Sequence, residues 1–532
     1  MFQTLAQGVM LQWGWRRILL AILAGAASAL AMPPFGFFPV LFFTFPVFVW
    51  LIDGAVASGA HKRRQEILSA AWAGWGFGFG YFLAGLWWVG GAFLVDAETF
   101  GWLMPFAVTL MPAGLALFFA AGAALARVFW RPGPFRIFVF AFAFGLEEIL
   151  RGYVLTGFPW NAFGYALAAN NASMQLGALI GLHGMSVLAV FIFASPAALG
   201  LSDAGHIRGR VIVPGLAAAL LLVSFGYGAY RLSLDEPPDT GVRIRVVQPS
   251  IPQEQKFDSE KASQTLSALL TLSDIATSPE SSGVGDFDAV IWPESAFPFY
   301  LQEEPAAVAA LAALIPGKTV LITGLQRYET APNNPRGYVG YNSIGVIDSN
   351  GAMIAHYDKT HLVPFGEYLP FQGFMEAIGF RQLTNMPGGF DAGETRAPVS
   401  VGDIPPFVPL ICYEAIFPGV VNRDLPRAAW ILNVTNDAWY GDTPGPRQHL
   451  LQARLRAVEE GLPMVRAANN GISAVTDSRG RIVASLSLNA RNVMDITLPG
   501  AFAPTFYVKT GILPALLLIS GVFLAGLLWR QR

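Results

Sequence analysis

Residues 407–414 read FVPLICYE, an apolar run that ends in Cys412 and continues into an aromatic and an acidic residue. Such a short apolar run indicates a buried strand. Cys412 is the only cysteine of the chain, which excludes an intramolecular disulfide and a multi-cysteine metal site. A lone cysteine after a buried strand is most often a small core residue. The functional alternative is a nucleophile at a strand-to-helix turn, where backbone N–H groups can stabilise an oxyanion.

Two further segments place a charged side chain just past a predicted strand. Residues 291–296 read IWPESA, so that Pro293 ends the strand and Glu294 emerges at the sheet edge. Residues 357–367 read YDKTHLVPFGE, so that Lys359 follows a hairpin strand. Taken singly, each charge is most often a solvated surface group, and His361 could equally be a packed core residue.

All three segments lie in one region, about residues 240–500, where β-rich runs alternate with helical ones. Strands are predicted at 243–250, 289–292, 320–324, 343–348, 353–357, 407–412, 430–434, 464–467, 473–476 and 482–485, and helices at 260–276, 306–315 and 448–460. This alternation, with some hairpins, predicts a layered α/β fold in which helices cover mostly buried strands.

The rest of the chain is strongly apolar. The whole sequence is 54% hydrophobic and 13% charged, whereas a soluble protein carries about 25% charged residues. Apolar runs near the length of about 20 residues that crosses a bilayer occur at 17–33, 38–53, 69–95, 103–127, 135–151, 174–200, 211–231 and 511–529. The sequence therefore predicts a bundle of about eight transmembrane helices. The expected domains are a seven-span region at 1–239, a catalytic domain at 240–500 and a C-terminal membrane helix at 501–532.

Loop charges give the orientation, because Lys and Arg collect on the cytoplasmic side of a membrane. They gather at 16–17, 62–64, 127–136, 208–210 and 530–532, which are alternate loops and the two ends. Both termini should therefore be cytoplasmic, with 240–500 outside. Glu147, Glu148 and Arg151 end the fifth span, and we expect them at the outer interface, near water. The segment TGFPWN at 156–161 is typical of a re-entrant loop or, equally, of an ordinary aromatic belt.

Charge and histidine content narrow the possible partners. The formal net charge is −2 and no basic tract is present, so we expect no nucleic-acid partner. The six histidines show no HExxH or paired spacing, so we expect no metal and no cofactor.

Taken together, the charged segments resemble the nitrilase superfamily of carbon–nitrogen hydrolases. Its three signatures correspond in order to WPE at 292–294, Lys359 with PFGE at 364–367, and CYE at 412–414. The resemblance implies an αββα sandwich with Glu294 as general base, Lys359 as oxyanion stabiliser and Cys412 as nucleophile. These types suit acyl transfer: a base takes the thiol proton, fixed charge meets the oxyanion, and sulfur holds the acyl group as a thioester.

The insertion of such a domain between the last two membrane spans resembles the bacterial apolipoprotein N-acyltransferases, over essentially the full chain. TGFPW at 156–160 and IPQ at 251–253 are also similar to that family. The resemblance implies a multi-pass inner-membrane enzyme with its catalytic domain in the periplasm. It would move an acyl chain from a phospholipid, chiefly phosphatidylethanolamine, to Cys412, and then to the α-amino group of the N-terminal diacylglyceryl-cysteine of a lipoprotein.

The same resemblance implies supporting residues in the site: Glu367, Tyr413, Glu414, Phe257 and Trp160. Glu367 would orient Lys359, and Glu414 would support the nucleophile loop. Phe257 stands where the family often has Trp near the substrate entrance, so an indole hydrogen bond is absent there and a packing role is equally expected.

Three other functions compete with this interpretation. A membrane-tethered amidase would use the same three residues with water as the acceptor. A non-enzymatic scaffold would be indicated by the loss of one of them, but all three are present. A transporter would carry paired charges within its spans, which these apolar runs lack.

Overall fold

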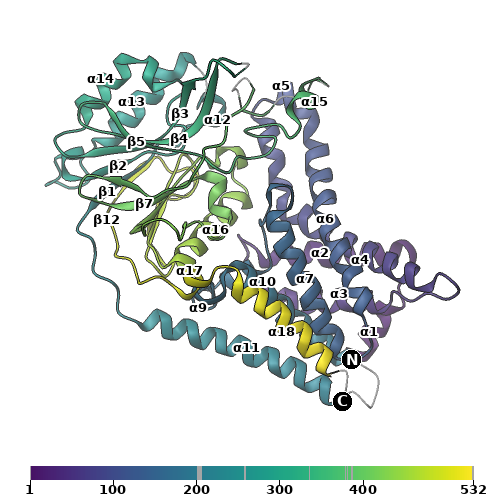
Figure 1. Cartoon of the computed structure of the whole chain (residues 1–532). Helices are drawn as coiled ribbons and strands as arrows, with labels where there is room; N and C mark the ends of the chain where they lie inside the picture. Colours follow the sequence, from purple (N-terminus) through teal and green to yellow (C-terminus); the bar gives the residue numbers. More distant parts are fainter. Residues whose placement is uncertain are drawn as a thin grey trace. The chain divides into compact units, whose positions relative to one another are not determined.

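The computed structural model describes residues 2–200, 207–256, 259–334, 336–377, 379, 382–384 and 388–529. The chain divides into two compact units (Figure 1). The first, helical unit comprises Met1–Gly90, Trp102–Leu234 and Thr505–Arg532, and the second comprises Gly91–Gly101 and Asp235–Pro504. Residues 91–101, which include the end of the expected span at 69–95 and the connection that follows it, thus belong to the same unit as the α/β region.

Each apolar run predicted to cross the membrane coincides with a helix of the first unit. Their bounds are α2 Gly14–Ser28, α3 Leu41–Asp53, α4 Lys62–Leu86, α6 Met104–Phe129, α7 Phe135–Tyr153, α10 Gly177–Ala194, α11 Ile207–Ser233 and α18 Leu513–Trp529. Shorter helices of this unit are α1 Phe2–Met10, α8 Gly164–Ala168, α9 Asn171–Met174 and α17 Phe506–Thr510.

Five of these stretches are long and apolar enough to cross a membrane. They are Gly14–Ala31, Lys62–Leu94, Ala97–Phe129, Gly177–Gly200 and Arg208–Ser233. The expected spans at α3 and α18 are shorter apolar helices, and α7 carries Arg136, Glu147, Glu148 and Arg151. The apolar helices mark a membrane protein, whereas the count of eight spans stays a prediction.

Glycines of α4 bring its backbone close to two neighbouring helices. A Cβ atom at Gly80 would lie 2.0 Å from the carbonyl oxygen of Ile22 in α2, and one at Gly74 would lie 2.4 Å from that of Phe119 in α6. Small residues allow membrane helices to pack at such short backbone separations. The spacing of these glycines therefore sets how tightly α2, α4 and α6 pack.

The charges at the end of α7 correct one expectation. Glu147, Glu148 and Arg151 are 3%, 2% and 1% exposed, so they do not face water as we expected. Arg151 donates to the carboxylate of Glu148 at 2.6 Å and to the carbonyl of Trp160 at 3.0 Å, and Glu148 accepts from the N–H of Phe163 at 2.9 Å. Arg151 and Glu148 thus form hydrogen bonds with backbone groups of the irregular segment after α7. Such hydrogen bonds allow a non-helical segment to lie among membrane helices.

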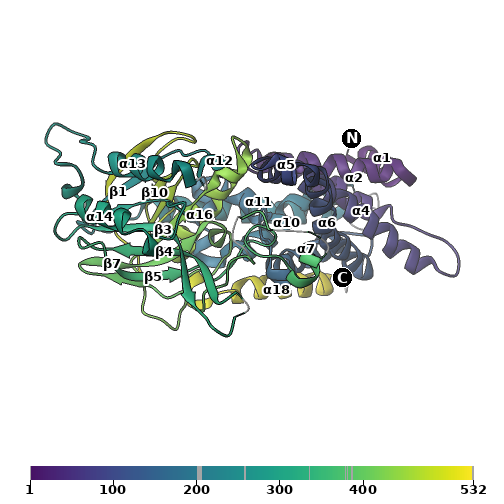
Figure 2. The same ribbon diagram turned by 90° about the horizontal axis from the view of Figure 1, so that it is seen from above.

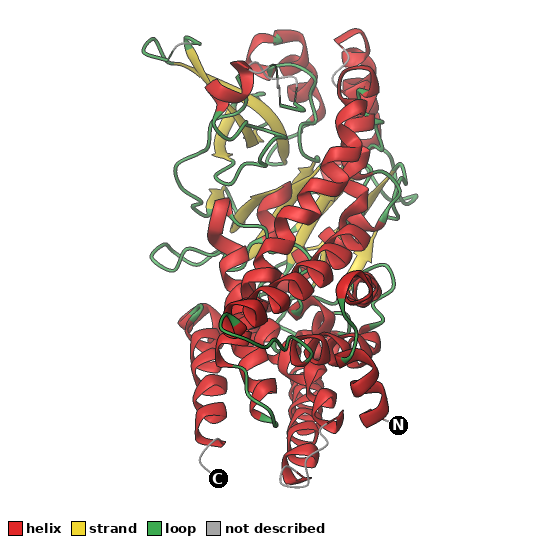
Figure 3. Cartoon of the chain, turned by 90° about the vertical axis from the view of Figure 1, so that its right-hand side faces the viewer, coloured by secondary structure: helices red, strands yellow, loops and turns green. Residues whose placement is uncertain are grey.

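The strands, yellow in Figure 3, form two six-stranded sheets in the second unit. The first sheet has the order β12-β1-β2-β3-β4-β5, with bounds β12 Asn492–Thr497, β1 Arg243–Gln248, β2 Ala289–Ile291, β3 Val320–Thr330, β4 Tyr338–Ile347 and β5 Met353–Asp358. The second has the order β11-β10-β9-β8-β7-β6, with bounds β11 Ile482–Ser485, β10 Ala474–Thr476, β9 Met464–Ala468, β8 Trp430–Thr435, β7 Ile404–Ile411 and β6 Val399–Val401. β1, β2 and β3 are parallel, as are β7, β8 and β9, and the other pairs are antiparallel.

Three apolar cores arrange these sheets in four layers. The largest core joins the facing sides of the two sheets, with Ile291 and Ile322 from the first and Ile411 and Trp430 from the second. The outer side of the first sheet packs against α13 (Ala262–Ser273) and α14 (Pro305–Leu314), which lie over it in Figure 2. The outer side of the second packs against α16 (Pro444–Glu460). The predicted αββα sandwich is thereby confirmed.

The predicted strands and helices of this domain all occur, with shifted ends. β3 and β4 are longer than expected and form one ten-residue antiparallel ladder. The short strands β6 and β12 and the short helices α5 (Ala97–Phe100), α12 (Gln253–Lys256) and α15 (Gln372–Ala377) were not predicted.

Candidate active site

The three residues of the predicted triad follow three strands of the second unit. Glu294 comes after β2, Lys359 directly after β5, and Cys412 directly after β7. Because β2 and β7 belong to the parallel parts of the two sheets, these side chains leave the carboxyl ends of strands, where α/β folds build their sites. Cys412 begins a 3-10 turn, Cys412–Ile416, with a φ of +47°. A side chain in that left-handed region marks a sharp, strained turn.

A buried charge network surrounds Lys359. Its ammonium lies 2.9 Å from the carboxylate of Glu367 and 3.9 Å from that of Glu294. The amide of Asn342, on β4, donates to both carboxylates at 2.8 Å. The other oxygen of Glu294 accepts from the backbone N–H of Asn436 at 2.8 Å. The structure therefore brings Glu294, Lys359 and Glu367 together around an asparagine that sequence analysis missed.

The charge state of Lys359 follows from these contacts. Burial alone would lower the pKa of its ammonium, but the carboxylates of Glu367 and Glu294 outweigh burial and raise this pKa above its ordinary value. A second buried lysine, Lys256 of α12, donates to the backbone carbonyl of Glu294 at 2.7 Å. Burial lowers the pKa of Lys256 to about 7, against the weaker opposing charges of Glu294 and Cys412. Lys359 thus keeps its positive charge at neutral pH.

Cys412 is buried, with 6% of its surface exposed. Burial and then the charge of Glu294 raise the pKa of the thiol to about 12, although Lys359 and a hydrogen bond with Thr435 oppose the shift. A thiolate, the nucleophilic form, must therefore be generated by a base during the reaction. The carboxylate of Glu294 is the neighbouring acceptor whose two oxygens are oriented by Asn342 and Asn436.

The two residues after Cys412 occupy the same turn. Glu414 is fully buried, and its carboxylate accepts from Arg396 at 2.7 Å, from the Tyr357 hydroxyl at 2.7 Å and from the Ile411 N–H at 2.8 Å. It fixes the loop before and after the nucleophile. The ring of Tyr413 packs at 5.8 Å from His361, measured between ring centroids.

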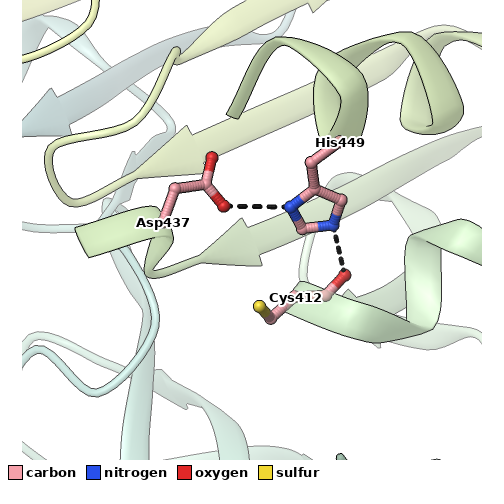
Figure 4. Close-up of side chains that lie close together, drawn as sticks. All are labelled: Cys412, Asp437 and His449. Carbon is pink, nitrogen blue, oxygen red and sulfur yellow. Dashed lines mark hydrogen bonds and ion pairs between the residues drawn. The ribbon is translucent and has the colours of Figure 1, made fainter. Parts of the chain in front are cut away.

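A second cluster lies beside the main chain of Cys412, as Figure 4 shows. One ligand atom from each of Cys412, Asp437 and His449 lies within 4.8 Å of the others, a spacing that could hold a metal ion. However, the guanidinium of Arg466 lies 2.7 Å from Asp437 and 3.1 Å from Nδ1 of His449. This fixed positive charge neutralises the carboxylate, so the donor set does not suit a cation.

Two predicted supporting residues, Phe257 and Trp160, are not among the contacts of this network. Phe257 lies outside the described residues. Trp160 belongs to the helical unit, where it is buried with its ring 5.0 Å from that of Trp88. Asn436 and Asp437 directly follow the buried strand β8, so their position after an apolar run could have marked them as site residues. Asn342 and His449 lie inside regular elements and had no such signal.

A carboxylate, a lysine and a cysteine at strand ends of an αββα sandwich define a protein of the carbon–nitrogen hydrolase class. Residues 243–502 match the carbon–nitrogen hydrolase family model, and residues 24–195 match the model of the apolipoprotein N-acyltransferase N-terminal domain.

Comparison with relatives extends to the whole chain. It is 50% identical to an apolipoprotein N-acyltransferase of Rhodopseudomonas palustris, covering 99% of this chain and 98% of that relative. It is 51% identical to an apolipoprotein N-acyltransferase of Bradyrhizobium diazoefficiens, covering 98% of this chain and 96% of that relative. Among solved structures, a mutant of the Nesterenkonia AN1 amidase from the nitrilase superfamily covers 51% of this chain and 94% of its own, with a TM-score of 0.34 and 18% identity. The chain belongs to the apolipoprotein N-acyltransferase family and is an acyltransferase of the membrane.

Proposed function

We propose that this enzyme moves one acyl chain from a phospholipid, chiefly phosphatidylethanolamine, to the α-amino group of the N-terminal diacylglyceryl-cysteine of an apolipoprotein. The observation that carries the proposal is a buried network beside Cys412. In it Lys359 contacts the carboxylates of Glu294 and Glu367, and the amide of Asn342 donates to both carboxylates. Both ends of the catalytic domain continue into apolar helices, α11 and α18, which tether it to the bilayer that holds both substrates.

In the first half-reaction the Cys412 thiol loses its proton to Glu294, and the sulfur attacks the ester carbonyl of the phospholipid. The resulting oxyanion is stabilised by the Lys359 ammonium and the Tyr413 N–H. Collapse breaks the ester bond, and Glu294 returns the proton to the departing oxygen of the lysophospholipid. The acyl group remains on Cys412 as a thioester.

In the second half-reaction the amine of the lipoprotein attacks the thioester carbonyl. Glu294 accepts a proton from the amine nitrogen, and the same two donors stabilise the second oxyanion. The C–S bond then breaks, an amide is left on the lipoprotein, and the thiolate of Cys412 regains the proton. Water must be excluded between the two steps, because hydrolysis of the thioester would waste the acyl group.

The supporting residues follow from the same scheme. Glu367 keeps Lys359 charged and aimed, and Glu414 holds the nucleophile turn through Ile411 and Arg396. The family resemblance adds Trp160 and Phe257 as further supporting residues of the proposed enzyme. The orientation with a periplasmic catalytic domain and cytoplasmic termini in the bacterial inner membrane is supported by the alternating Lys and Arg content of the loops.

Intact-mass analysis tests the proposal directly. The purified enzyme is incubated with phosphatidylethanolamine beside the Cys412→Ala variant. We expect the parent to gain one acyl chain that the variant does not gain. A diacylated lipopeptide with a free amine should remove this chain, whereas the same lipopeptide with an acetylated amine should not. If folded enzyme forms no adduct, or if water discharges it as fast as the amine does, the transferase scheme is wrong and the amidase alternative replaces it.

A further inference from the structure

The main chain of the nucleophile is held by a residue that the proposed reaction does not use. Nε2 of His449 lies 3.0 Å from the carbonyl oxygen of Cys412 (Figure 4). His449 comes from α16 and is completely buried. The carbonyl that it contacts belongs to the residue with a φ of +47°, the most strained point of the turn.

A chain of ionic contacts fixes this imidazole in place. Nδ1 of His449 lies 2.9 Å from Asp437, whose other carboxylate oxygen lies 2.7 Å from the guanidinium of Arg466. The hydroxyl of Thr435 also donates to Asp437 at 3.0 Å, and Arg466 donates to the side-chain oxygen of Asn433. These partners come from β8, β9 and the turn after β8, so the imidazole is anchored to the second sheet.

The contacts determine which nitrogen of His449 carries hydrogen. A carbonyl oxygen can only accept, so Nε2 must donate to Cys412. Nδ1 faces both a carboxylate and a guanidinium, and it can donate to the first or accept from the second. Nε2 therefore carries a hydrogen whether His449 is neutral or protonated.

This arrangement leaves His449 unable to serve as the base for the thiol. Both of its nitrogens already face hydrogen-bond partners, and neither of those partners is the sulfur of Cys412. A direct acid–base role is thus left to Glu294, and the contact of His449 with the main chain needs another explanation.

The geometry of the peptide bond supplies that explanation. In a trans peptide the C=O and the N–H of one unit point in opposite directions. The bond from Cys412 to Tyr413 is trans, because the structure contains one cis bond, Pro33–Pro34, among its described residues. Holding the carbonyl of Cys412 toward His449 therefore holds the N–H of Tyr413 toward the opposite side.

We propose that His449, anchored by Asp437 and Arg466, is a positioning residue that aims the Tyr413 N–H at the oxyanion of both half-reactions. The inference rests on the proposed role of Cys412 as nucleophile. His449 touches neither substrate nor the reacting atoms in this scheme, and acts by keeping one donor of the oxyanion hole in place before substrate arrives.

Two amide substitutions separate the two nitrogens of the ring. The amide of His449→Asn can replace Nδ1 and keep the contact with Asp437, but it is too short to reach Cys412. The amide of His449→Gln can replace Nε2 and donate to the Cys412 carbonyl. Removal of an oxyanion donor costs about 10²–10³ in rate, so a donor that is only loosened in His449→Asn should cost of the order of 10–100-fold.

The experiment measures three rates on each full-length variant in detergent: acylation of Cys412 by phosphatidylethanolamine, discharge to a diacylated lipopeptide, and alkylation of Cys412 by iodoacetamide. Alkylation forms no oxyanion, so it reports the placement and ionisation of the sulfur alone. We expect His449→Asn to slow acylation and discharge together, with an unchanged KM for lipid and unchanged alkylation. We expect His449→Gln to recover most of both rates.

Other outcomes overturn the inference. Acylation of His449→Asn at the parent's rate would show that the carbonyl contact has no catalytic effect. A parallel loss of alkylation would show that His449 places the sulfur and not the N–H. If His449→Asn does not fold, a failure of folded His449→Gln to keep most of the parent's rate in both half-reactions refutes the idea. If the parent itself forms no adduct, the proposed function fails first, and that result is distinct from these.

Discussion

Replacement of Glu367 by glutamine should move the basic limb of the pH–activity profile to lower pH. Two buried lysines lie beside Glu294. Lys359 contacts the carboxylates of Glu367, at 2.9 Å, and Glu294, at 3.9 Å, whereas Lys256 donates to the backbone carbonyl of Glu294. The hydrogen-bond partner of Lys256 is a neutral carbonyl, and burial lowers the pKa of this lysine to about 7. The Glu367→Gln substitution keeps the shape of the side chain and removes the charge, so the pKa of Lys359 should fall from well above its ordinary value toward that of Lys256.

The sign of the effect follows from the role of Lys359. Only the protonated ammonium stabilises the oxyanion, so acylation is supported below the pKa of Lys359 and lost above it. In the parent the pKa of Lys359 is raised, so this lysine stays protonated between about pH 7 and pH 9. Titration of Lys359 should therefore cause no loss of the acylation rate in that range. The Glu367→Gln variant should lose the rate across that window, by about tenfold for each pH unit above the new pKa.

The assay is the rate of acyl-adduct formation on Cys412, followed by intact mass from pH 5.5 to 9.5. Asp403→Asn is the matched control, because it removes an exposed carboxylate that pairs with Lys318 at 3.4 Å and lies beside the opposite end of β7 from Cys412. A Glu367→Gln profile that stays parallel to the parent at high pH would refute the argument, since Lys359 would then hold its proton without Glu367.

Three further predictions follow from other contacts. Alkylation of Cys412 should accelerate about tenfold per pH unit from pH 7 to 9 without a plateau, because a thiol with a pKa of about 12 is protonated there; a plateau near neutrality would indicate a resting thiolate. Arg396→Met should lower the free energy of unfolding by about 3 kcal/mol, since it leaves buried Glu414 without its ion pair. Thermal unfolding in detergent measures this loss, and an unchanged unfolding temperature would show that the ion pair does not stabilise the fold. Gly80→Val should abolish the folded helical unit, because its Cβ would lie 2.0 Å from the Ile22 carbonyl oxygen; a monodisperse, active variant would contradict the close packing of α2 and α4.

Most of the sandwich was predictable because local patterns coincide with its long-range contacts. The apolar runs before Glu294 and Cys412 are central parallel strands, which are buried on both faces and therefore uniformly apolar. β12 was missed because its partner β1 lies about 250 residues earlier in the chain, and its sequence NVMDIT lacks a clear period. Such a strand is specified by the neighbour that it covers and not by its own residues.

The site was predictable where its residues follow strands, and not where they lie inside regular elements. Asn342 reads as one polar residue in β4, and only the fold places it between two carboxylates. His449 reads as one residue of a helix, although it meets a nucleophile 37 residues away. The misplacement of Glu147 and Glu148 has a similar origin. Hydropathy locates the end of α7, but Glu148 is also satisfied by the Phe163 N–H from the segment after the helix.

The two sheets supply different parts of the chemistry. In the proposed reaction the first sheet provides the acid–base and charge-stabilising groups, through Glu294, Lys359 and Asn342. The second sheet provides the proposed nucleophile, Cys412, and helix α16, which covers that sheet, provides His449, which contacts the Cys412 backbone. The hydrogen bond from the Asn436 N–H to Glu294, 2.8 Å long, joins the two sets across the sheets. In the proposed reaction the base must reach a sulfur on the other sheet, so we expect small changes in sheet separation to alter proton transfer. We therefore expect the close-packed apolar layer between the sheets to maintain catalytic geometry as well as stability.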